Sequence, residues 1–455
     1  VDGPQAYTLQ VQPAVSSDPH YSRRDGADVD LSNTDNDVAG ITVSPTAGLL
    51  TTELGGTATF SVQLTSQPDA DVTIPVSSGT LAEGTVAPTS LTFTTANWNV
   101  PQTVTVTGAD DFVVDGDQAY NVVTGAAIST DALYTAMNPA DVSVTNTDND
   151  VVGVSLTPAA GLVTGETGAT ATFAVDLTSQ PSADVSFALS SSNTGEGTVS
   201  PASLTFTTVT WNLPQTVTVT GVDDVVVDGD QAYSIVTDAI TSADGLYAGF
   251  NPSDVGVSNT DNDVASVTAT PAAGLVTNET GATATFALVL TSQPSADVTV
   301  PVSRSNVGEG TVAPASITFT PAGWNLPQTV TVTGVDDFVA DGSVAYSIVL
   351  GAATSGDLQY SGFDPADVSA TNGDNDLVGI SVSPTAGLVT TELGGTTSFS
   401  VRLNSQPTAD VSIAVSSDDL TEGSPSPGSL TFTAANWNLP HAVIITGADD
   451  LVADG

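Results

Sequence analysis

Thr147-Asp148-Asn149-Asp150 is the stretch from which the organisation of this chain follows, because its Asp-Asn-Asp run returns at a fixed interval. The other copies are Asp35-Asn36-Asp37, Asp261-Asn262-Asp263 and Asp374-Asn375-Asp376, each 113 residues from the next. A constant period of this length indicates a tandem array whose repeats are near the usual size of a domain. We therefore expect complete repeats at 38–150, 151–263 and 264–376, and parts of repeats at 1–37 and 377–455.

Apolar and polar residues alternate through the complete repeat at 38–150. In 57–64, for example, Phe60, Val62 and Leu64 fall on one face, which is typical of a half-buried strand. Turn-forming segments separate the runs, and none has a sustained helical period. The sequence predicts an all-β fold: a tandem array of seven-stranded antiparallel β-sandwich domains (Ig-like) in an elongated rod. The expected strands are 38–43 with 49–52 as one split strand, 57–64, 72–76, 91–93, 103–107, 118–124 and 141–146.

The same alignment divides one repeat between the two ends of the sequence. Residues 1–37 match 114–150 without a gap and are expected to supply the last two strands of a repeat, whereas 377–455 are expected to supply the first five. Two interpretations are open. The sequence is a window cut from a longer repetitive chain, or subunits polymerise head to tail by completing each other's partial repeats.

Charge is the extreme feature of the composition. Four basic residues against 51 acidic ones give a formal net charge of −47, which repels phosphate groups. Nucleic acid and membrane insertion are therefore not expected among its partners, and no apolar run reaches the ~20 residues of a membrane span. Since 40% of the residues are apolar, the chain is expected to fold, with cations or salt offsetting its self-repulsion. The absence of cysteine excludes disulfides.

Most recurring acids fall on one side of the expected sandwich. If successive strands reverse direction, the connections after 49–52, 72–76 and 103–107 and the end of 141–146 share one pole. The acids there recur in each complete repeat, and we expect them to bind metal: Glu53, Glu83, Asp110, Asp111, Asp115, Asp148 and Asp150; Glu166, Glu196, Asp223, Asp224, Asp228, Asp261 and Asp263; and Glu279, Glu309, Asp336, Asp337, Asp341, Asp374 and Asp376.

Carboxylates in this number, without histidine or cysteine, suit Ca²⁺, which takes 6 to 8 oxygen ligands in flexible geometry. Several ions per repeat are expected. The alternative interpretation is that these acids only form turns and keep the surface soluble. Asp71, Asp131 and Asp141 also recur, yet they belong to the opposite pole, so recurrence alone does not identify a ligand. Convergence on one pole is what favours calcium.

These residues carry a family resemblance. Glu53, Leu91-Thr92-Phe93, Thr103 to Val106, Asp110-Asp111, Asp115-Gly116-Asp117 and Thr147 to Asp150 together resemble the Calx-beta domain. That family includes calcium-sensing domains of sodium/calcium exchangers and tandem copies in bacterial surface proteins. The resemblance covers every period and implies a calcium site built from Glu53, Glu83, Asp110, Asp111, Asp115, Asp148 and Asp150. It departs from the family at Glu83, whose surroundings differ, and at Asn149 in the centre of the terminal run.

Other chemistry has little support in the sequence. His20 and His441 have no counterparts in the other repeats, so no enzyme activity is expected. Trp98 recurs as Trp211, Trp324 and Trp437; it is a sugar-stacking platform, or it closes the core or packs between repeats.

We expect a bacterial extracellular or cell-surface protein that forms a stiff, calcium-stabilised fibre, filament or adhesin stalk and associates with itself. The alternatives are a module that binds surface glycans or proteins, and an accessory array of a larger secreted enzyme.

Overall fold

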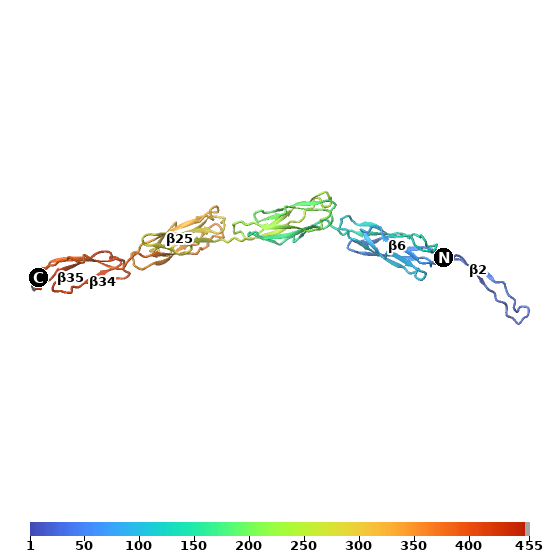
Figure 1. Ribbon diagram of the computed structural model, residues 1–455, viewed down its shortest axis with the longest axis horizontal. Helices are drawn as coiled ribbons and strands as arrows, with labels where there is room; N and C mark the ends of the chain where they lie inside the picture. Colours follow the sequence, from blue (N-terminus) through green and yellow to red (C-terminus); the bar gives the residue numbers. More distant parts are fainter. Residues whose placement is uncertain (451–455) are drawn as a thin grey trace. The chain divides into compact units, whose positions relative to one another are not determined.

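A computed structural model describes residues 1–450 of the chain, and every regular element in that range is a β-strand (Figure 1). The prediction of an all-β fold made of tandem sandwiches is confirmed. Among the described residues, no helix has the length and apolarity that crossing a membrane requires.

The repeat at 38–150 is a sandwich of two sheets. One has the order β3-β5-β9-β7 and the other has the order β4-β11-β10-β6-β8. The strands are β3 (Ile41–Ser44), β4 (Leu49–Thr52), β5 (Thr57–Leu64), β6 (Val72–Ser78), β7 (Gly84–Ala87), β8 (Ser90–Phe93), β9 (Gln102–Gly108), β10 (Gln118–Thr124) and β11 (Val142–Thr147).

The core lies between these sheets, and the alternation in the sequence builds it. Phe60 and Val104 of the first sheet and Val72 and Val122 of the second are buried in one cluster. Their polar neighbours along each strand face outward, because successive side chains of a strand point to opposite faces. The sandwich therefore follows directly from the period-two pattern.

Two details of the predicted sandwich are wrong. A short strand that was not expected, β7, pairs with β9, and β4 pairs with β11 in parallel rather than antiparallel orientation. The sequence signal for β7 is weak because its four residues offer only Val86 as an alternating large apolar side chain. The parallel pair arises because the first strand is split: after the turn that begins at Pro45, the chain crosses from the sheet of β3 to the sheet of β4.

The next two repeats reproduce this topology. In 151–263 the strands are β12 (Val154–Thr157), β13 (Leu162–Gly165), β14 (Thr170–Leu177), β15 (Val185–Ser191), β16 (Gly197–Ser200), β17 (Ser203–Phe206), β18 (Gln215–Gly221), β19 (Gln231–Thr237), β20 (Thr241–Ser242) and β21 (Val255–Thr260). In 264–376 they are β22 (Val267–Thr270), β23 (Leu275–Asn278), β24 (Thr283–Leu290), β25 (Val298–Arg304), β26 (Gly310–Ala313), β27 (Ser316–Phe319), β28 (Gln328–Gly334), β29 (Val344–Leu350), β30 (Thr354–Ser355) and β31 (Val368–Gly373).

The first and last segments of the chain, 1–37 and 377–450, each form sheets of their own. Residues 1–37 form a two-stranded antiparallel ribbon of β1 (Gln5–Leu9) and β2 (Val29–Asn33). Residues 377–450 form a four-stranded sheet and a two-stranded sheet. Their strands are β32 (Ile380–Ser383), β33 (Thr396–Leu403), β34 (Val411–Ala414), β35 (Gly423–Ser426), β36 (Ser429–Phe432) and β37 (His441–Gly447).

The compact units of the chain do not coincide with the repeats of its sequence. One compact unit holds Val1–Thr164, Ala169–Gly221 and Ala232–Ser258, and the other holds Gly165–Gly168, Val222–Gln231 and the chain from Asn259 onward. The domain boundaries drawn from the period, and the elongated rod, therefore stay predictions.

Candidate metal centre

The acidic residues of the repeat at 38–150 lie at one end of the sandwich because of how its strands run. Glu53 directly follows β4, and Asp148 and Asp150 directly follow β11, which is parallel to β4. Glu83 directly precedes β7, which pairs with the end of β9, and the loop after β9 carries the remaining acids, Asp110, Asp111 and Asp115. Four segments far apart in the sequence thus deliver carboxylates to the same pole.

A glycine makes this convergence possible. At Gly108, the last residue of β9, an added Cβ would lie 2.2 Å from the carbonyl oxygen of Thr52 and 2.5 Å from Oδ1 of Asn146. Only a residue without a side chain lets the acidic loop approach the end of β4 so closely. Gly334 occupies the corresponding position in the repeat at 264–376, where a Cβ would lie 2.1 Å from the carbonyl oxygen of Asn278.

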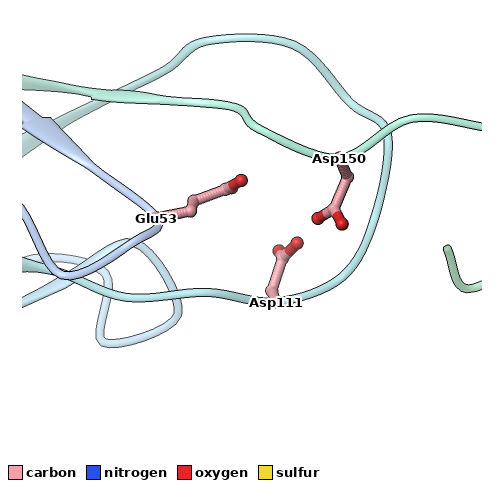
Figure 2. A group of neighbouring side chains, drawn as sticks. All are labelled: Glu53, Asp111 and Asp150. Carbon is pink, nitrogen blue, oxygen red and sulfur yellow. The ribbon is translucent and has the colours of Figure 1, made fainter. Parts of the chain in front are cut away.

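Two groups of carboxylates form at this pole and share one residue. Oxygens of Glu53, Asp111 and Asp150 lie within 4.8 Å of one another, and so do oxygens of Glu83, Asp111 and Asp115. Figure 2 shows the first group, in which the side chains of Glu53, Asp111 and Asp150 come from separate segments and point toward a common space. Three oxygens this close are a partial coordination shell for a cation.

Asp150 shows that the first group fits a cation. Its Oδ2 atom is buried and has no hydrogen-bond partner, and the same is true of Oδ2 in Asp263 and Asp376. Burial raises the pKa of Asp150 to about 6, and the negative charges of Asp110 and Glu53 contribute to the increase. A buried carboxylate oxygen without a donor is costly unless a positive charge satisfies it. The donor set contains only oxygen, as hard divalent cations prefer.

The asparagine at the centre of the terminal run positions the glutamate. The backbone N–H of Asn149 donates to Oε2 of Glu53 at 2.9 Å, and its side-chain amide donates to the same oxygen at 3.2 Å. The backbone N–H groups of Asn262 and Asn375 donate to their glutamates at the same distance, 2.9 Å. These bonds hold Oε2, so the other carboxylate oxygen is the one available to an ion.

Asp148 accepts backbone hydrogen bonds with both of its carboxylate oxygens. Its Oδ2 accepts the backbone N–H of Gly116 at 2.7 Å, and its Oδ1 accepts that of Asp150 at 2.7 Å. It belongs to neither carboxylate group and instead fixes the acidic loop against the terminal run. In Asp374, the corresponding hydrogen bonds from Asp376 and Gly342 lower the pKa of the carboxyl group. Asp261 accepts the N–H of Gly229 in the same way, at 2.7 Å.

Asp110 also lies beside the groups rather than within either of them. Its Oδ1 accepts the backbone N–H of Phe112 at 3.3 Å, and its charge acts on Asp150. The counterpart Asp223 accepts a hydrogen bond from the side-chain amide of Asn262 at 3.2 Å. Asp336 accepts the backbone N–H of Phe338 at 3.2 Å. The three residues therefore shape the loop and add negative potential to the site.

A buried asparagine that the sequence analysis did not single out supports the second group. Asn146, only 1% exposed, donates to the carbonyl oxygen of Ala109 at 2.9 Å and makes a long contact of 3.5 Å with Oε2 of Glu83. Its Oδ1 accepts the hydroxyl of Thr51 at 3.0 Å. The sequence contains a signal for this residue: a polar side chain occupies an inward-facing strand position and recurs as Asn33, Asn259 and Asn372.

Glu83 is itself buried, and this burial raises its pKa. The hydrogen bond from Asn146 opposes the shift, whereas the charges of Asp111 and Asp115 add to it.

The other complete repeats build the same arrangement. Glu166, Asp224 and Asp263 form one group, and Glu279, Asp337 and Asp376 form another. Burial raises the pKa of Glu166, Glu279, Asp263 and Asp376. Glu196 and Glu309, the counterparts of Glu83, are buried, and Asn372 donates to Glu309 at 3.3 Å. For Asp228, burial again raises the pKa, and Asp341 adds negative charge near Glu309.

Acids and tryptophans away from this pole are structural. Asp131 accepts the backbone N–H groups of Asp69 and Leu133, each at 2.8 Å, and so folds its own loop. Trp98 packs against the core of its repeat, and Trp211 is 8% exposed within its core. The ring of Trp211 also lies 5.9 Å from that of Phe112 in the preceding repeat, and the ring of Trp437 lies 6.2 Å from that of Phe338. Of the roles considered for the recurring tryptophan, closing the core and packing between repeats therefore both have direct structural support.

Comparisons with known proteins find no family and only distant structural likenesses. No family model and no curated protein matches the chain. Among solved structures, CBD12 from CALX1.2 is 13% identical, with 45% of this chain and 82% of that chain covered and a TM-score of 0.24. The calcium binding domain CBD12 of CALX1.1 is 15% identical, with 44% and 80% covered and a TM-score of 0.23. Fibronectin(III)-like modules of Clostridium thermocellum CbhA are 14% identical, with 49% and 95% covered and a TM-score of 0.15. At these TM-scores the likenesses carry no argument.

Proposed function

We propose that this chain is a calcium-binding structural protein of the Calx-beta type, whose repeats form a stiff surface fibre, filament or adhesin stalk outside the cell. Its role is mechanical rather than enzymatic. The observation that carries the proposal is the buried, unpartnered Oδ2 of Asp150, which lies with Glu53 and Asp111 and recurs as Asp263 and Asp376.

The two carboxylate groups indicate which residues would be the ligands. Glu53, Asp111 and Asp150 would hold one Ca²⁺ ion, and Glu83, Asp111 and Asp115 would hold a second, with Asp111 serving both. Bound calcium supplies positive charge that offsets the repulsion among these carboxylates. Asp148 and Asn149 orient the ligands through backbone hydrogen bonds, and Asn146 does so from the strand below.

Calcium at this pole would also stiffen the array. Asp150 is followed directly by Val151, the first residue of the next repeat, so no flexible linker separates them. An ion that fixes Asp150 therefore fixes the point from which the next repeat starts. Small-angle scattering with calcium and with chelator tests this part: a smaller maximum dimension and a lower melting temperature after chelation are expected. Unchanged values would exclude a stiffening role.

Calcium binding itself is tested by calorimetric titration of the whole chain. A variant that combines Asp150→Asn, Asp263→Asn and Asp376→Asn removes one ligand from the same group in each complete repeat. The matched control combines Asp71→Asn, Asp184→Asn and Asp297→Asn, which neutralises three exposed acids at the opposite pole. Weakened binding in the first variant and unchanged binding in the control are expected. Equal titration curves for the two variants would refute the site.

A further inference from the structure

The acidic loop after β9 carries an aromatic residue directly behind its pair of aspartates. Phe112 follows Asp110 and Asp111 and is 49% exposed, and Phe338 holds the same position with the same exposure in the repeat at 264–376. Neither ring belongs to the core cluster of its own repeat. A single exposed apolar side chain is ordinary on a protein surface, so what these rings contact decides whether they have a role.

Each of these rings meets the tryptophan of the following repeat. The ring of Phe112 is tilted by 50° to that of Trp211, and the ring of Phe338 is tilted by 39° to that of Trp437. Tilted aromatic rings at such separations attract one another. Trp211 also packs into the core of its own repeat, and it belongs to the same compact unit of the chain as Phe112. The phenylalanine therefore contacts a side chain that is itself anchored.

A main-chain hydrogen bond joins the same two loops. The carbonyl oxygen of Phe112 accepts the backbone N–H of Gln180 at 2.7 Å. The side-chain amide of Gln180 donates to the carbonyl oxygen of Thr208 at 2.9 Å, and Thr208 lies three residues before Trp211. The ring and the carbonyl group of Phe112 thus reach two parts of one connected loop system in the following repeat.

The backbone at the phenylalanine is strained. Its φ angle is 63° at Phe112 and 64° at Phe338, in the left-handed region that bulky side chains rarely adopt. Within the repeat, Asp110 and Asp336 accept the backbone N–H groups of these residues at 3.3 and 3.2 Å. A strained conformation persists only where the surrounding structure imposes it. The loop therefore adopts a costly shape in the two repeats whose ring contacts the next tryptophan.

The repeat at 151–263 differs at this position, where it has Val225. Among the described residues, φ is positive at Phe112 and Phe338 but not at Val225. A side chain that branches at Cβ tolerates the left-handed region especially poorly. The carbonyl oxygen of Val225 still accepts the backbone N–H of Gln293, at 2.6 Å. Valine, however, has no ring to set against Trp324, the tryptophan of the following repeat.

We propose that the residue after the acidic pair sets the stiffness of each junction between repeats. Phenylalanine at 112 and 338 locks its repeat to the next one, whereas Val225 makes the junction between 151–263 and 264–376 the compliant point of the array. The main-chain hydrogen bond is common to Phe112, Val225 and Phe338, so it fixes where the loops meet. The aromatic contact decides how firmly they are held.

This inference rests on the array of the proposed function but not on bound calcium. The contacts that carry it are a ring pair and a hydrogen bond between uncharged groups. An array with stiff and compliant junctions bends at a defined place instead of uniformly along its length.

Electron–electron double resonance on the whole chain compares the junctions. Spin labels are attached to cysteines one period apart: Thr59→Cys with Thr172→Cys across the first junction, and Thr172→Cys with Thr285→Cys across the second. The three positions are exposed and equivalent on β5, β14 and β24, and the chain has no other cysteine. The second pair should give the broader distance distribution. Equal widths, or a broader distribution for the first pair, would overturn the proposal without any change at the junction itself.

Variants at the junction identify the residue responsible. Phe112→Val should broaden the first distribution to the width of the second, whereas Phe112→Tyr keeps a ring and should leave it narrow. The matched control is Leu133→Val, which shortens a side chain that is 47% exposed at the opposite pole of the same repeat. It should change nothing. Equal broadening by Phe112→Val and Leu133→Val would contradict a specific contact.

The reciprocal change tests whether the ring is sufficient. Val225→Phe should narrow the second distribution, and an unchanged width would count against the proposal. Phe112→Val should broaden the first distribution in calcium and in chelator alike, so this inference stands even if the calcium titration fails. A first distribution that Phe112→Val leaves unchanged under both conditions would refute it, whether or not the chain binds calcium.

Discussion

Neutralising Asp150 and its two counterparts should have opposite effects on stability with and without calcium. In the presence of calcium, the variant with Asp150→Asn, Asp263→Asn and Asp376→Asn loses a ligand in each complete repeat. In chelator, it loses a buried carboxylate whose Oδ2 has no partner and whose pKa burial raises to about 6. The first change removes a stabilising ion, and the second removes an unfavourable buried charge.

The magnitude with calcium follows from mass action. A ligand present at 100 times its dissociation constant stabilises the folded state by about 2.7 kcal/mol per site. For a domain of this size, 1 kcal/mol shifts the melting temperature by roughly 4 °C, so losing one site per repeat should lower it by about 10 °C. In chelator at neutral pH, the variant should instead melt above the parent chain.

The assay is thermal unfolding followed by circular dichroism, in calcium and in chelator, with the Asp71→Asn, Asp184→Asn and Asp297→Asn chain as the control. The control removes the same net charge from exposed positions, so it corrects for the general relief of repulsion. Melting temperatures of the variant and the control that shift in the same direction by the same amount under both conditions would refute a ligand role for Asp150.

Three further outcomes are expected. Calcium affinity, measured by calorimetry, should fall as the pH is lowered through about 6, because the proton that Asp150 takes up competes with the ion. Without metal, the stability of the fold should depend on pH in the opposite direction. The raised folded-state pKa stabilises the protein at low pH, and this contribution is lost as the pH rises through about 6. Asn146→Leu should cost about 2 to 4 kcal/mol in urea unfolding, since it leaves the part-buried carbonyl of Ala109 and the buried carboxylate of Glu83 without their donor. A cost below about 0.5 kcal/mol would contradict this role. Tyr134→Phe should cost about 1 kcal/mol, because its hydroxyl bonds to the carbonyl oxygen of Ser66 at 2.7 Å; Tyr120→Phe, whose hydroxyl is buried without a partner, should cost less.

Most of the fold can be predicted from the sequence because each strand buries one face. The alternation of Phe60, Val62 and Leu64 predicts β5 to the residue, and the period transfers that assignment to every repeat. What the alternation cannot report is pairing direction, so the parallel contact of β4 with β11 appears only in the structure. β7 is missed for a related reason: a four-residue strand at a sheet edge is held by its hydrogen bonds to β9 rather than by several buried side chains.

The pole of the acids is predictable, but their individual roles are not. Strand reversal is enough to bring Glu53, Asp111 and Asp150 to one end. Whether a given carboxylate faces an ion or the backbone depends on local turns. Both carboxylate oxygens of Asp148 accept backbone N–H groups, and the backbone N–H of Asn149 donates to Glu53. Such short-range geometry has no periodic signature. Asn146 is likewise a single polar residue at an inward-facing strand position, where apolar residues are the rule.

The most direct test of the central claim is an anomalous difference map from crystals of the whole chain grown with Tb³⁺ in place of Ca²⁺, since lanthanides also prefer oxygen ligands. We predict a strong peak among Glu53, Asp111 and Asp150, with equivalent peaks at Glu166, Asp224 and Asp263 and at Glu279, Asp337 and Asp376. Ordered density for these side chains with no anomalous peak between them would contradict the account.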